Sequence, residues 1–342
     1  MDTAGDLSVS VALCTYNGER FIGEQLSSIL AQTFLPAEIV VSDDDSQDAT
    51  LAVVEQTFSR WRTEHPGVDV RLVLLRNERA LGVTANFESA VSSCTGDLIA
   101  LSDQDDVWHR NRLDIQRARF QPAPNVDLVF SDARLVDAEG RPFGGSLFNA
   151  LEASPEVIAD LRTPRAFGRL LRRNLATGAT VMFRRTLLDR ALPFPPNWVH
   201  DEWLSLVAAA TGNLDVVEDQ LVDYRQHGRN AIGVTAPTLR YKIRRVLEPR
   251  LDRNRLLADK FATFAHWAAT RDDLLDATYA TLAAEKAEAE ASREKLPSAR
   301  LSRIPPIVRG LSRGWYGRFT SRGGLDVLRD LLQSHATPRN GR

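Results

Sequence analysis

Short apolar runs alternate with helix-like segments through the first hundred residues. Runs typical of buried strands occupy Ser8–Leu13, Ile39–Val41, Val70–Leu75 and Leu98–Leu101. Helical spacing of apolar residues predicts helices over Phe21–Leu30, from Asp48 or Thr50 to about Arg62, and over Val83–Val91. Strands that alternate with helices in this way predict a mostly parallel sheet with right-handed crossovers. The expected fold class is therefore α/β.

The pattern continues less regularly to about residue 234. Further predicted helices cover Arg110–Phe120 and Glu202–Ala210. Predicted strands cover Leu128–Phe130 and Ala179–Phe183. The stretch Ala133–Val136 follows the first of these strands, and a turn is expected at Asp137–Gly140. Leu214–Tyr224 is interpreted as a hairpin or strand pair.

The character of the chain changes beyond about residue 235. Leu239–Leu257 and Leu256–Lys295 have helical patterns, and the Ala/Glu/Lys-rich tract Ala283–Ala291 predicts a solvated helix. Residues 1–234 carry 22 basic and 33 acidic residues, whereas residues 235–342 carry 21 basic and 12 acidic ones. We therefore expect two domains, an acidic one at 1–234 and a basic helical region at 235–342.

The segment Ser298–Arg322 combines arginines with apolar and aromatic residues and contains no acidic residue. Its arginines are Arg300, Arg303, Arg309, Arg313, Arg318 and Arg322. Such a segment is either a basic helix pair on the protein surface or a contact for an anionic membrane or a lipid-linked phosphate. Pro305, Pro306, Gly310 and Gly314 are expected to break a continuous helix. No motif favours nucleic acid, which is not an expected partner.

Overall composition indicates a globular protein, with 43% hydrophobic and 26% charged residues. Cys14 and Cys94 lie in apolar surroundings and are interpreted as buried thiols of a reducing compartment. No run approaches the length of a membrane span, and the N-terminus lacks the features of a signal peptide. A cytoplasmic protein is expected, with peripheral contact at the inner face of the cell membrane as a further hypothesis.

Clusters of aspartate follow two of the predicted strands. Asp103, Asp105 and Asp106 follow Leu98–Leu101, and Asp43, Asp44 and Asp45 follow Ile39–Val41. Ligands of open α/β sheets bind beyond the carboxyl ends of strands, and a hard divalent cation makes crowded carboxylates tolerable there. The glycine patterns of dinucleotide-binding and P-loop proteins are absent, and the acidic run lacks the glycine and glutamate of an EF-hand. Asp48 is interpreted as a helix cap.

An ordered set of segments resembles the family 2 glycosyltransferases, which have a GT-A nucleotide-diphospho-sugar transferase fold. The matching segments are Val11–Asn17 with Glu19, Gln25–Thr33, Ile39–Asp48, Asn77 with Gly82 and Asn86, Gly96–Trp108 and His200–Trp203. The resemblance covers residues 8–234, and Asp45 stands where the family has glycine. The segments Ser102–Trp108 and Tyr224–Gly228 are most similar to a rhamnosyltransferase-like branch. Without a Gln-x-x-Arg-Trp motif, a processive synthase is not expected.

The resemblance implies roles for residues around a nucleotide-sugar. Thr15, Asp44 and Asp43 would border the pyrimidine and ribose. Asp105 is the first choice for a Mn²⁺ or Mg²⁺ ligand, Asp103 would bind the ion directly or through water, and His227 would complete the shell. The remaining nucleotide contacts would be Tyr16, Asn17, Glu19, Asn86, Arg225 and Arg229, with Arg225 and Arg229 in a loop that closes over the diphosphate or simply lies at the surface. The donor sugar or acceptor would contact Asp106, Trp108, His200, Glu202 and Trp203, with a metal contact as the alternative role of Asp106.

Asp201 is the candidate general base, since it precedes the predicted helix at Glu202 and a helix N-terminus favours an ionised carboxylate. The alternative role for Asp201 is a helix cap, and His200 is alternatively a core histidine. One base opposite the leaving group implies inversion. The expected donor is dTDP-L-rhamnose or a UDP-hexose, and the expected acceptor is a lipid-linked surface glycan. Competing hypotheses are a sugar-phosphate nucleotidyltransferase, which should have a glycine-rich first loop, and a scaffold subunit that binds nucleotide-sugar without catalysis.

Overall fold

The computed structural model describes residues 7–227, 253–271 and 273–333. The chain forms two compact units, one of residues 1–164 with 175–236 and the other of residues 165–174 with 237–342. The domain boundary at 234/235 stays a prediction, because residues 228–252 lie outside the described part.

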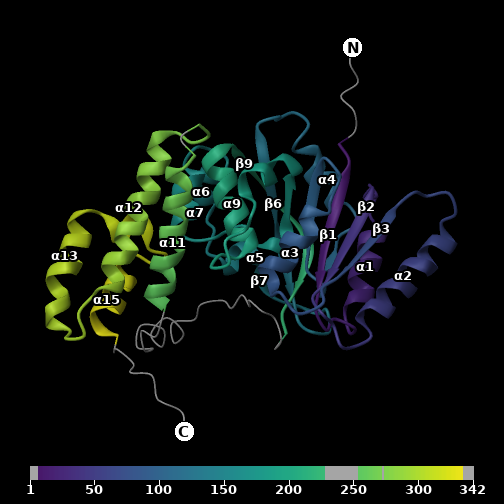
Figure 1. The fold of residues 1–342 in the computed structure, drawn as a ribbon, viewed down its shortest axis with the longest axis horizontal. Helices are drawn as coiled ribbons and strands as arrows, with labels where there is room; N and C mark the ends of the chain where they lie inside the picture. The colour runs from purple at the N-terminus through teal and green to yellow at the C-terminus, as the bar shows by residue number, and fades with distance from the viewer. Residues whose placement is uncertain (1–6, 228–252, 272, 334–342) are drawn as a thin grey trace, which may run out of the picture. The chain divides into compact units, whose positions relative to one another are not determined.

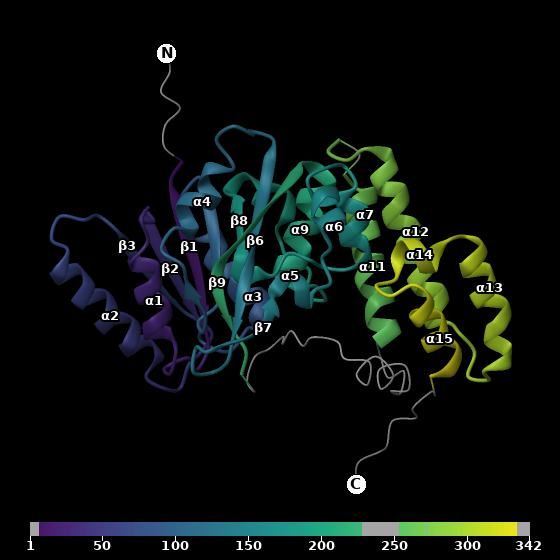
Figure 2. The same ribbon diagram turned by 180° about the vertical axis from the view of Figure 1, so that it is seen from behind.

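A nine-stranded sheet forms the centre of the first unit, in the order β3-β2-β1-β4-β8-β6-β9-β5 with β7 beside β6 (Figures 1 and 2). Its first half contains β1 (Val9–Thr15), β2 (Glu38–Asp43), β3 (Arg71–Arg76) and β4 (Leu98–Ser102), all parallel. The connecting helices are α1 (Ile22–Leu30), α2 (Thr50–Glu64) and α3 (Val83–Ser92). This arrangement confirms the predicted parallel α/β half.

The second half of the sheet is mixed. It contains β5 (Val107–Trp108), β6 (Val126–Val136), β7 (Pro142–Ser146), β8 (Val181–Arg184) and β9 (Asn213–Arg225). β8 is antiparallel to β4 and β6, whereas β9 is parallel to β6. The hairpin interpretation of Leu214–Tyr224 is wrong, because the whole segment is one strand that pairs along β6. Leu128–Phe130 and Ala133–Val136 likewise belong to one strand.

Further helices of the first unit are α4 (Arg112–Ala118), α5 (Leu147–Ala150), α6 (Pro155–Leu161), α8 (Leu188–Ala191) and α9 (His200–Thr211). Short 3-10 turns occupy Gly178–Thr180 and Arg185–Leu187. The apolar pattern did not predict α5 and α6, which are too short to show a helical period.

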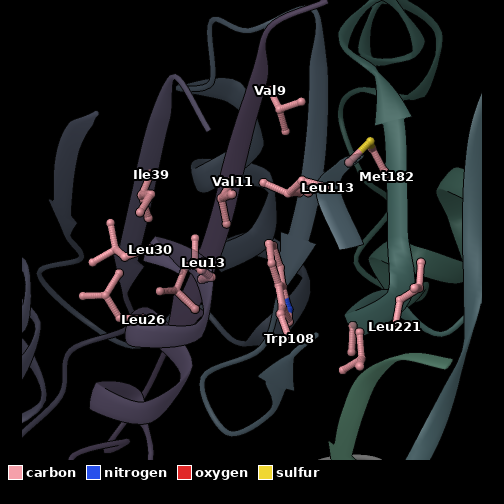
Figure 3. Packing of buried hydrophobic residues seen from close by; sticks show 14 of the residues in the cluster. Val9, Val11, Leu13, Leu26, Leu30, Ile39, Trp108, Leu113, Met182 and Leu221 are labelled. Atoms are coloured by element: carbon pink, nitrogen blue, oxygen red, sulfur yellow. The ribbon is translucent and has the colours of Figure 1, made fainter. Parts of the chain in front are cut away.

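The core of the first unit lies between β1 and its flanking elements. Alternate residues of a strand point to the same face, and Val9, Val11 and Leu13 are all fully buried. Figure 3 shows them with Ile39 of β2, Leu26 and Leu30 of α1, Trp108, Leu113, Met182 and Leu221. Cys14 and Cys94 are buried free thiols, as predicted.

The second unit is helical. It contains α7 (Ala166–Arg172), α11 (Arg253–Ala269), α12 (Ala277–Glu294), a 3-10 turn (Leu301–Arg303), α13 (Ile304–Ser312), α14 (Trp315–Phe319) and α15 (Gly324–Leu332). The predicted helix Leu256–Lys295 is thus two helices. Most of Leu239–Leu257 lies outside the described residues. No helix within the described ranges is long and apolar enough to cross a membrane.

The segment Ser298–Arg322 forms no continuous helix, as predicted, but of the four residues expected to break it only Gly314 lies between two helices. Pro305 and Pro306 lie in the first turn of α13, where no intrahelical N–H is lost, so they start a helix instead of breaking one. Gly310 lies inside α13, and the chain turns at Gly314, which has φ 71°. The Ala283–Ala291 helix is not fully solvated, because α12 buries Lys286 and Glu290.

Candidate active site

Gln104 ties the acidic segment after β4 to the end of β1. Leu13 of β1 pairs with Ser102 of β4, so the two strands end side by side. Gln104 Oε1 accepts hydrogen bonds from Thr15 Oγ1 (2.7 Å) and Tyr16 N (2.8 Å), and Gln104 Nε2 donates to Tyr16 O (3.1 Å). Sequence reasoning assigned no role to Gln104, although it lies within the matched motif.

Four carboxylates interact at this edge of the sheet. Burial, Asp105 and Asp201 together raise the pKa of Asp103 to about 7. Burial and the charges of Asp105 and Asp103 also raise the pKa of Asp106 well above its usual value. Burial raises the pKa of the Tyr224 hydroxyl, and all four carboxylates contribute to that rise. The structure therefore brings Asp103, Asp105, Asp106 and Asp201 into one electrostatic cluster.

Arg112 supplies a buried positive charge beneath this cluster. Its side chain is fully buried, stacks 3.7 Å from the ring centroid of Trp108, and donates to Leu101 O at 3.2 Å. Burial lowers the pKa of Arg112 to about 9, while Asp106 and Asp103 act in the opposite direction. Arg112 thus remains charged at neutral pH and offsets part of the carboxylate charge.

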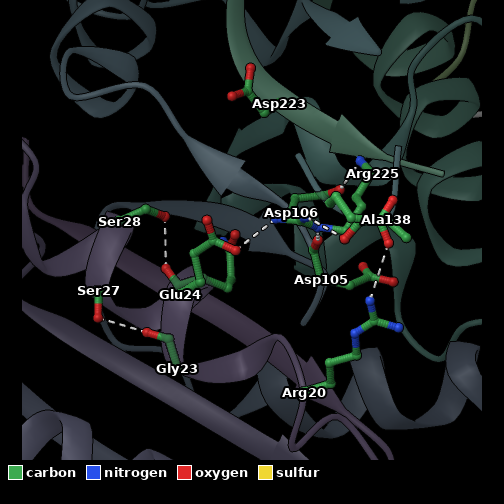
Figure 4. Close-up of polar contacts among 12 residues, drawn as sticks. Arg20, Gly23, Glu24, Ser27, Ser28, Asp105, Asp106, Ala138, Asp223 and Arg225 are labelled. Atoms are coloured by element: carbon green, nitrogen blue, oxygen red, sulfur yellow. Dashed lines mark hydrogen bonds and ion pairs between the residues drawn. The ribbon is translucent and has the colours of Figure 1, made fainter. Parts of the chain in front are cut away.

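Arg225 fixes the backbone that carries Asp105 and Asp106 (Figure 4). Arg225 N donates to Asp106 Oδ1 at 2.9 Å, and the guanidinium donates to Asp105 O at 2.7 Å and Ala138 O at 2.9 Å. A further guanidinium nitrogen bonds Glu24 Oε2 of α1 at 2.7 Å. Arg225 is 3% exposed. The side chain is therefore buried and bonded to protein acceptors, and its predicted contact with the diphosphate stays a prediction.

His227 lies against Asp105. Its Nε2 is 2.8 Å from Asp105 Oδ2, and its ring stacks on Phe21 with centroids 5.0 Å apart. Both side chains are only about one-eighth exposed, at 12% and 13%. The structure therefore places His227 beside the first-choice metal ligand, as the resemblance implied. Arg229 lies outside the described residues.

Asp201 lies in the first turn of α9 and accepts a hydrogen bond from Gly178 N at 2.7 Å. A Cβ at position 178 would come within 3.3 Å of Asp201 Oδ2, so glycine allows this close approach. His200 is buried and stacks on Phe87 at 3.8 Å, and burial lowers the pKa of His200 to about 3. His200 is thus a neutral core residue behind Asp201. Glu202 is half-buried.

Two residues predicted to contact the sugar, Trp203 and Trp108, are buried. Trp203 is 1% exposed, and its indole N–H donates to Ala191 O at 2.7 Å. Trp108 is 3% exposed beneath the Arg112 guanidinium. Packing within the sheet and helix layers buries both rings, and their predicted contacts with the sugar stay predictions.

The carboxylate of Asp44 organises the loop before α3. Asp44 accepts hydrogen bonds from Asn77 Nδ2 (3.0 Å), Leu81 N (2.7 Å) and Gly82 N (2.9 Å). Asn86 is 3% exposed and bridges Ser42 and Asn77. Asp44 and Asn86 are thus both buried, at 5% and 3% exposed, and bonded within the chain, and their predicted contacts with a nucleotide stay predictions.

Asp43 and the residues after β1 form a connected turn. The Asp43 carboxylate accepts hydrogen bonds from Ser46 N at 2.9 Å and from the Ser46 hydroxyl. The same hydroxyl oxygen accepts a hydrogen bond from Asn17 N at 2.8 Å. Asn17 Oδ1 accepts from Gln47 N at 2.8 Å, and Glu19 Oε2 accepts from Ala49 N at 3.0 Å. The contacts seen for Asn17 and Glu19 are thus with the chain itself.

Tyr16 and Asp45 complete this edge. Tyr16 is 52% exposed, so its ring is available to a ligand. Asp45 has φ 65°, a left-handed conformation that explains why the family prefers glycine there.

An open pocket of about 620 Å³ lies between the Asp44-bound loop and the segment that leads to α9. It is lined by Leu81–Ala85, Glu88, Ser89, Ser92, Phe194 and Pro196. Sequence reasoning did not find this pocket, since its walls come from segments about a hundred residues apart.

The carboxylates fit a divalent cation in chemistry. Asp106 Oδ2 is buried and has no hydrogen-bond partner among the described residues. Burial and, after it, like charges raise the pKa of Asp103 and Asp106, and a bound cation would offset the like-charge part of that cost. Within the described ranges, no three His, Cys, Asp or Glu side chains are already arranged around one ion position. The metal site therefore stays a prediction.

Comparison with known families agrees with this geometry. Residues 10–190 match the family model described as Glycosyl transferase family 2. The chain belongs to this glycosyltransferase family. It is 30% identical over 207 residues to an Escherichia coli relative named UDP-Glc:alpha-D-GlcNAc-diphosphoundecaprenol beta-1,3-glucosyltransferase WfgD, an alignment that covers 59% of this chain and 70% of WfgD.

Solved structures show the same fold. TarS 1–349 of S. aureus aligns with a TM-score of 0.55 at 18% identity, over 95% of this chain and 90% of TarS. A TarS 1–349 complex with UDP-GlcNAc aligns with a TM-score of 0.52 at 19% identity, over the same shares. The mannosyltransferase PcManGT of Pyrobaculum calidifontis, solved with GDP-Man and Mn²⁺, aligns with a TM-score of 0.51 at 21% identity, over 96% of this chain and 86% of PcManGT. The GT-A fold implied by the sequence resemblance is confirmed for this glycosyltransferase.

Proposed function

We propose that this glycosyltransferase moves a sugar from a pyrimidine nucleoside diphosphate to a hydroxyl of a lipid-linked glycan, with a divalent cation and with inversion. The observation that carries the proposal is the cluster of Asp103, Asp105, Asp106 and Asp201 at the carboxyl edge of the sheet. Such a cluster combines acceptors for a cation with a carboxylate at a helix N-terminus.

The donor would lie across the ends of β1 and β2. Thr15 and Asp43 are directly paired at these strand ends, and Asp44 follows. The exposed Tyr16 ring offers an apolar face for a pyrimidine base. The donor is therefore proposed to be a UDP-hexose or dTDP-L-rhamnose. The TarS complex with UDP-GlcNAc supports a uridine donor by fold.

Asp103, Asp105 and His227 are the residues proposed to hold Mn²⁺ or Mg²⁺. A bound cation would neutralise the negative charge that develops on the diphosphate leaving group. Asp106 has one oxygen tied to Arg225 N, and it supports the segment that carries Asp105. The positive charge of Arg112 offsets part of the repulsion among these carboxylates in the folded chain.

Asp201 is proposed as the general base. The N–H of Gly178 orients its carboxylate, and the N-terminus of α9 favours the ionised form. In a single displacement, Asp201 takes the proton of the acceptor hydroxyl while the acceptor oxygen bonds to the anomeric carbon. The bond from that carbon to the diphosphate breaks, the nucleoside diphosphate leaves, and the configuration inverts.

The name of WfgD describes an acceptor on diphosphoundecaprenol, which supports a lipid-linked acceptor for this chain. Specificity for one glycan depends on loops and not on the fold.

A donor panel tests the proposal. Purified protein is incubated with UDP-glucose, UDP-GlcNAc, dTDP-L-rhamnose or GDP-mannose, in Mn²⁺, Mg²⁺ or EDTA, and slow release of nucleoside diphosphate is measured. We expect release from a uridine or thymidine donor that requires the cation, and an inverted anomeric signal by NMR. Formation of nucleoside triphosphate and sugar 1-phosphate when pyrophosphate is added to the donor would instead identify a nucleotidyltransferase. Tight donor binding without turnover would identify a scaffold subunit.

A further inference from the structure

The second unit has more apolar surface than its own packing covers. Ile307 of α13 is buried in a small cluster with Leu296 and Tyr316. A neighbouring stripe at helical spacing faces solvent and consists of Leu301, Ile304, Val308 and Leu311, which are 80%, 44%, 55% and 49% exposed. The helix therefore has an apolar arc wider than its contacts require.

The packed helix α15 repeats this pattern. Val327 and Leu331 pack against the Ile307 cluster, while Leu325, Leu328 and Leu332 are exposed. Figures 1 and 2 both show α13 beside α15 in the second unit. We call the exposed stripe Leu301, Ile304, Val308 and Leu311 the apolar face, and Leu325, Leu328 and Leu332 are exposed on the neighbouring helix.

The acidic side chains of α15 point away from solvent. Asp330 is 2% exposed and bonds Arg293 and the hydroxyl of Tyr316. Asp326 is 3% exposed and accepts from Arg322 N at 2.9 Å. Neither acid adds surface charge beside the apolar face.

Basic residues accompany the apolar face in the sequence. Lys295 to Leu325 contains seven basic residues and no acidic one. Three of these arginines already interact within the chain. Arg303 is fully buried and bonds backbone carbonyls. Arg313 and Arg318 form ion pairs with Glu288 and Glu285 of α12, respectively. Arg300 and Arg309 are exposed, next in sequence to Leu301 and Val308.

We infer that the apolar face docks on an anionic lipid bilayer, with its leucine, isoleucine and valine side chains at the acyl boundary and Arg300 and Arg309 among the head groups. Exposed apolar residues with flanking arginines suit a helix lying in the interface plane. A second copy of the same face is a poor partner, because the interface would gather Arg300 and Arg309 of both copies while Asp326 and Asp330 are buried and cannot pair with them. This contact goes beyond the proposed transfer reaction and would hold the enzyme where a lipid-linked acceptor lies.

Vesicle co-sedimentation of the full chain tests the inference. We expect binding to phosphatidylglycerol/phosphatidylcholine vesicles, much weaker binding to phosphatidylcholine alone, and partial loss in high salt. The double variant Val308→Ser/Leu311→Ser should lower the partition coefficient roughly tenfold or more. Arg309→Glu should lower it about fivefold or more on anionic vesicles only. The matched control is Leu256→Ser, an exposed leucine of α11 that should leave partitioning unchanged.

Three results would overturn the inference. These are absence of wild-type binding, equal binding by the Val308/Leu311 double variant, or a wild-type dimer in sedimentation velocity that the double variant dissociates. Thermal melting confirms that each variant is folded. Donor hydrolysis in vesicle-free buffer should be the same in the double variant and in the wild type. If the wild type hydrolyses no donor, the proposed function is wrong, and vesicle binding still tests the membrane inference independently.

Discussion

At the residue scale, Asp105 and its neighbours differ in what holds them. Asp105 meets His227 through its side chain and Arg225 through its backbone carbonyl, whereas Asp106 is tied through its carboxylate. The residue best placed to reach a ligand is therefore Asp105, and the residues around it set its position.

Asp105→Ala should abolish transfer and remove cation-dependent donor binding, because the diphosphate charge is no longer neutralised. Calorimetry of donor binding with Mn²⁺ and with EDTA measures both effects. Asp219→Ala, an exposed acid on β9, is the matched control and should behave as wild type. Normal turnover of Asp105→Ala would rule out Asp105 as a metal ligand.

Asp201→Asn should reduce turnover by about 10² to 10⁴ with donor affinity nearly unchanged, as expected for loss of a general base. Steady-state kinetics and donor calorimetry separate the two quantities. Parallel loss of donor binding would make Asp201 a binding or structural residue.

Arg225 is expected to be a positioning residue. Arg225→Lys cannot reproduce the fork that reaches Asp105 O, Ala138 O and Glu24. We expect a roughly tenfold or greater rise in the Mn²⁺ concentration for half-maximal activity, as for other residues that orient metal ligands. Arg20→Ala, an exposed arginine near the same Phe21 ring, is the control. An unchanged Mn²⁺ midpoint in Arg225→Lys would show that the fork does not position Asp105.

At the element scale, α12 shows how a helix that looks solvated in sequence can be buried. Glu290 accepts from Lys286 Nζ at 2.6 Å and from an Arg293 guanidinium nitrogen at 2.8 Å. All three side chains are at most 6% exposed. These charges are tolerated only because they compensate one another.

Glu290→Gln should therefore lower the free energy of unfolding by about 3 kcal/mol, because it leaves buried cations with less compensation. Glu288 of the same helix is 59% exposed and pairs with Arg313. Glu288→Gln breaks this ion pair and should lower the free energy of unfolding by at most about 1 kcal/mol. Urea denaturation measures both. Equal effects of the two variants would show that burial does not strengthen the Glu290 interactions.

At the scale of the whole molecule, the carboxylate cluster couples stability to pH. The pKa of Asp103 rises from 3.8 to about 7 on folding, so the folded chain binds more protons than the unfolded chain between these values. Stability from this group is therefore present at low pH and is lost as pH rises through about 7.

Asp103→Asn removes this titration, so its melting temperature relative to wild type in EDTA should be higher at pH 8 than at pH 5, by on the order of a few degrees. Scanning fluorimetry at both pH values measures the difference. Mn²⁺ at pH 8 should stabilise wild type more than the variant. A difference that does not change with pH would contradict the raised pKa of Asp103.

The sequence by itself determined the parallel half of the sheet and the position of the acidic segments. Apolar periodicity is local, and the carboxyl ends of parallel strands must share an edge, so the grouping of Asp43, Asp44 and Asp103 followed from pattern alone. The family followed from the order of these segments. The sequence pattern did not predict that β9 is one unbroken strand or that a helix begins beside Pro305.

Only the tertiary structure decided which polar residues are buried and hydrogen-bonded within the chain. Arg225 reaches Glu24 across 201 positions of sequence, and Asp201 receives its hydrogen bond from Gly178, 23 positions away. Asn86, Trp203 and Arg225 have the side-chain chemistry of ligand contacts, yet burial and hydrogen bonding within the chain satisfy them. The physical reason is that hydrogen-bond partners and burial depend on segments distant in sequence, which no local pattern encodes.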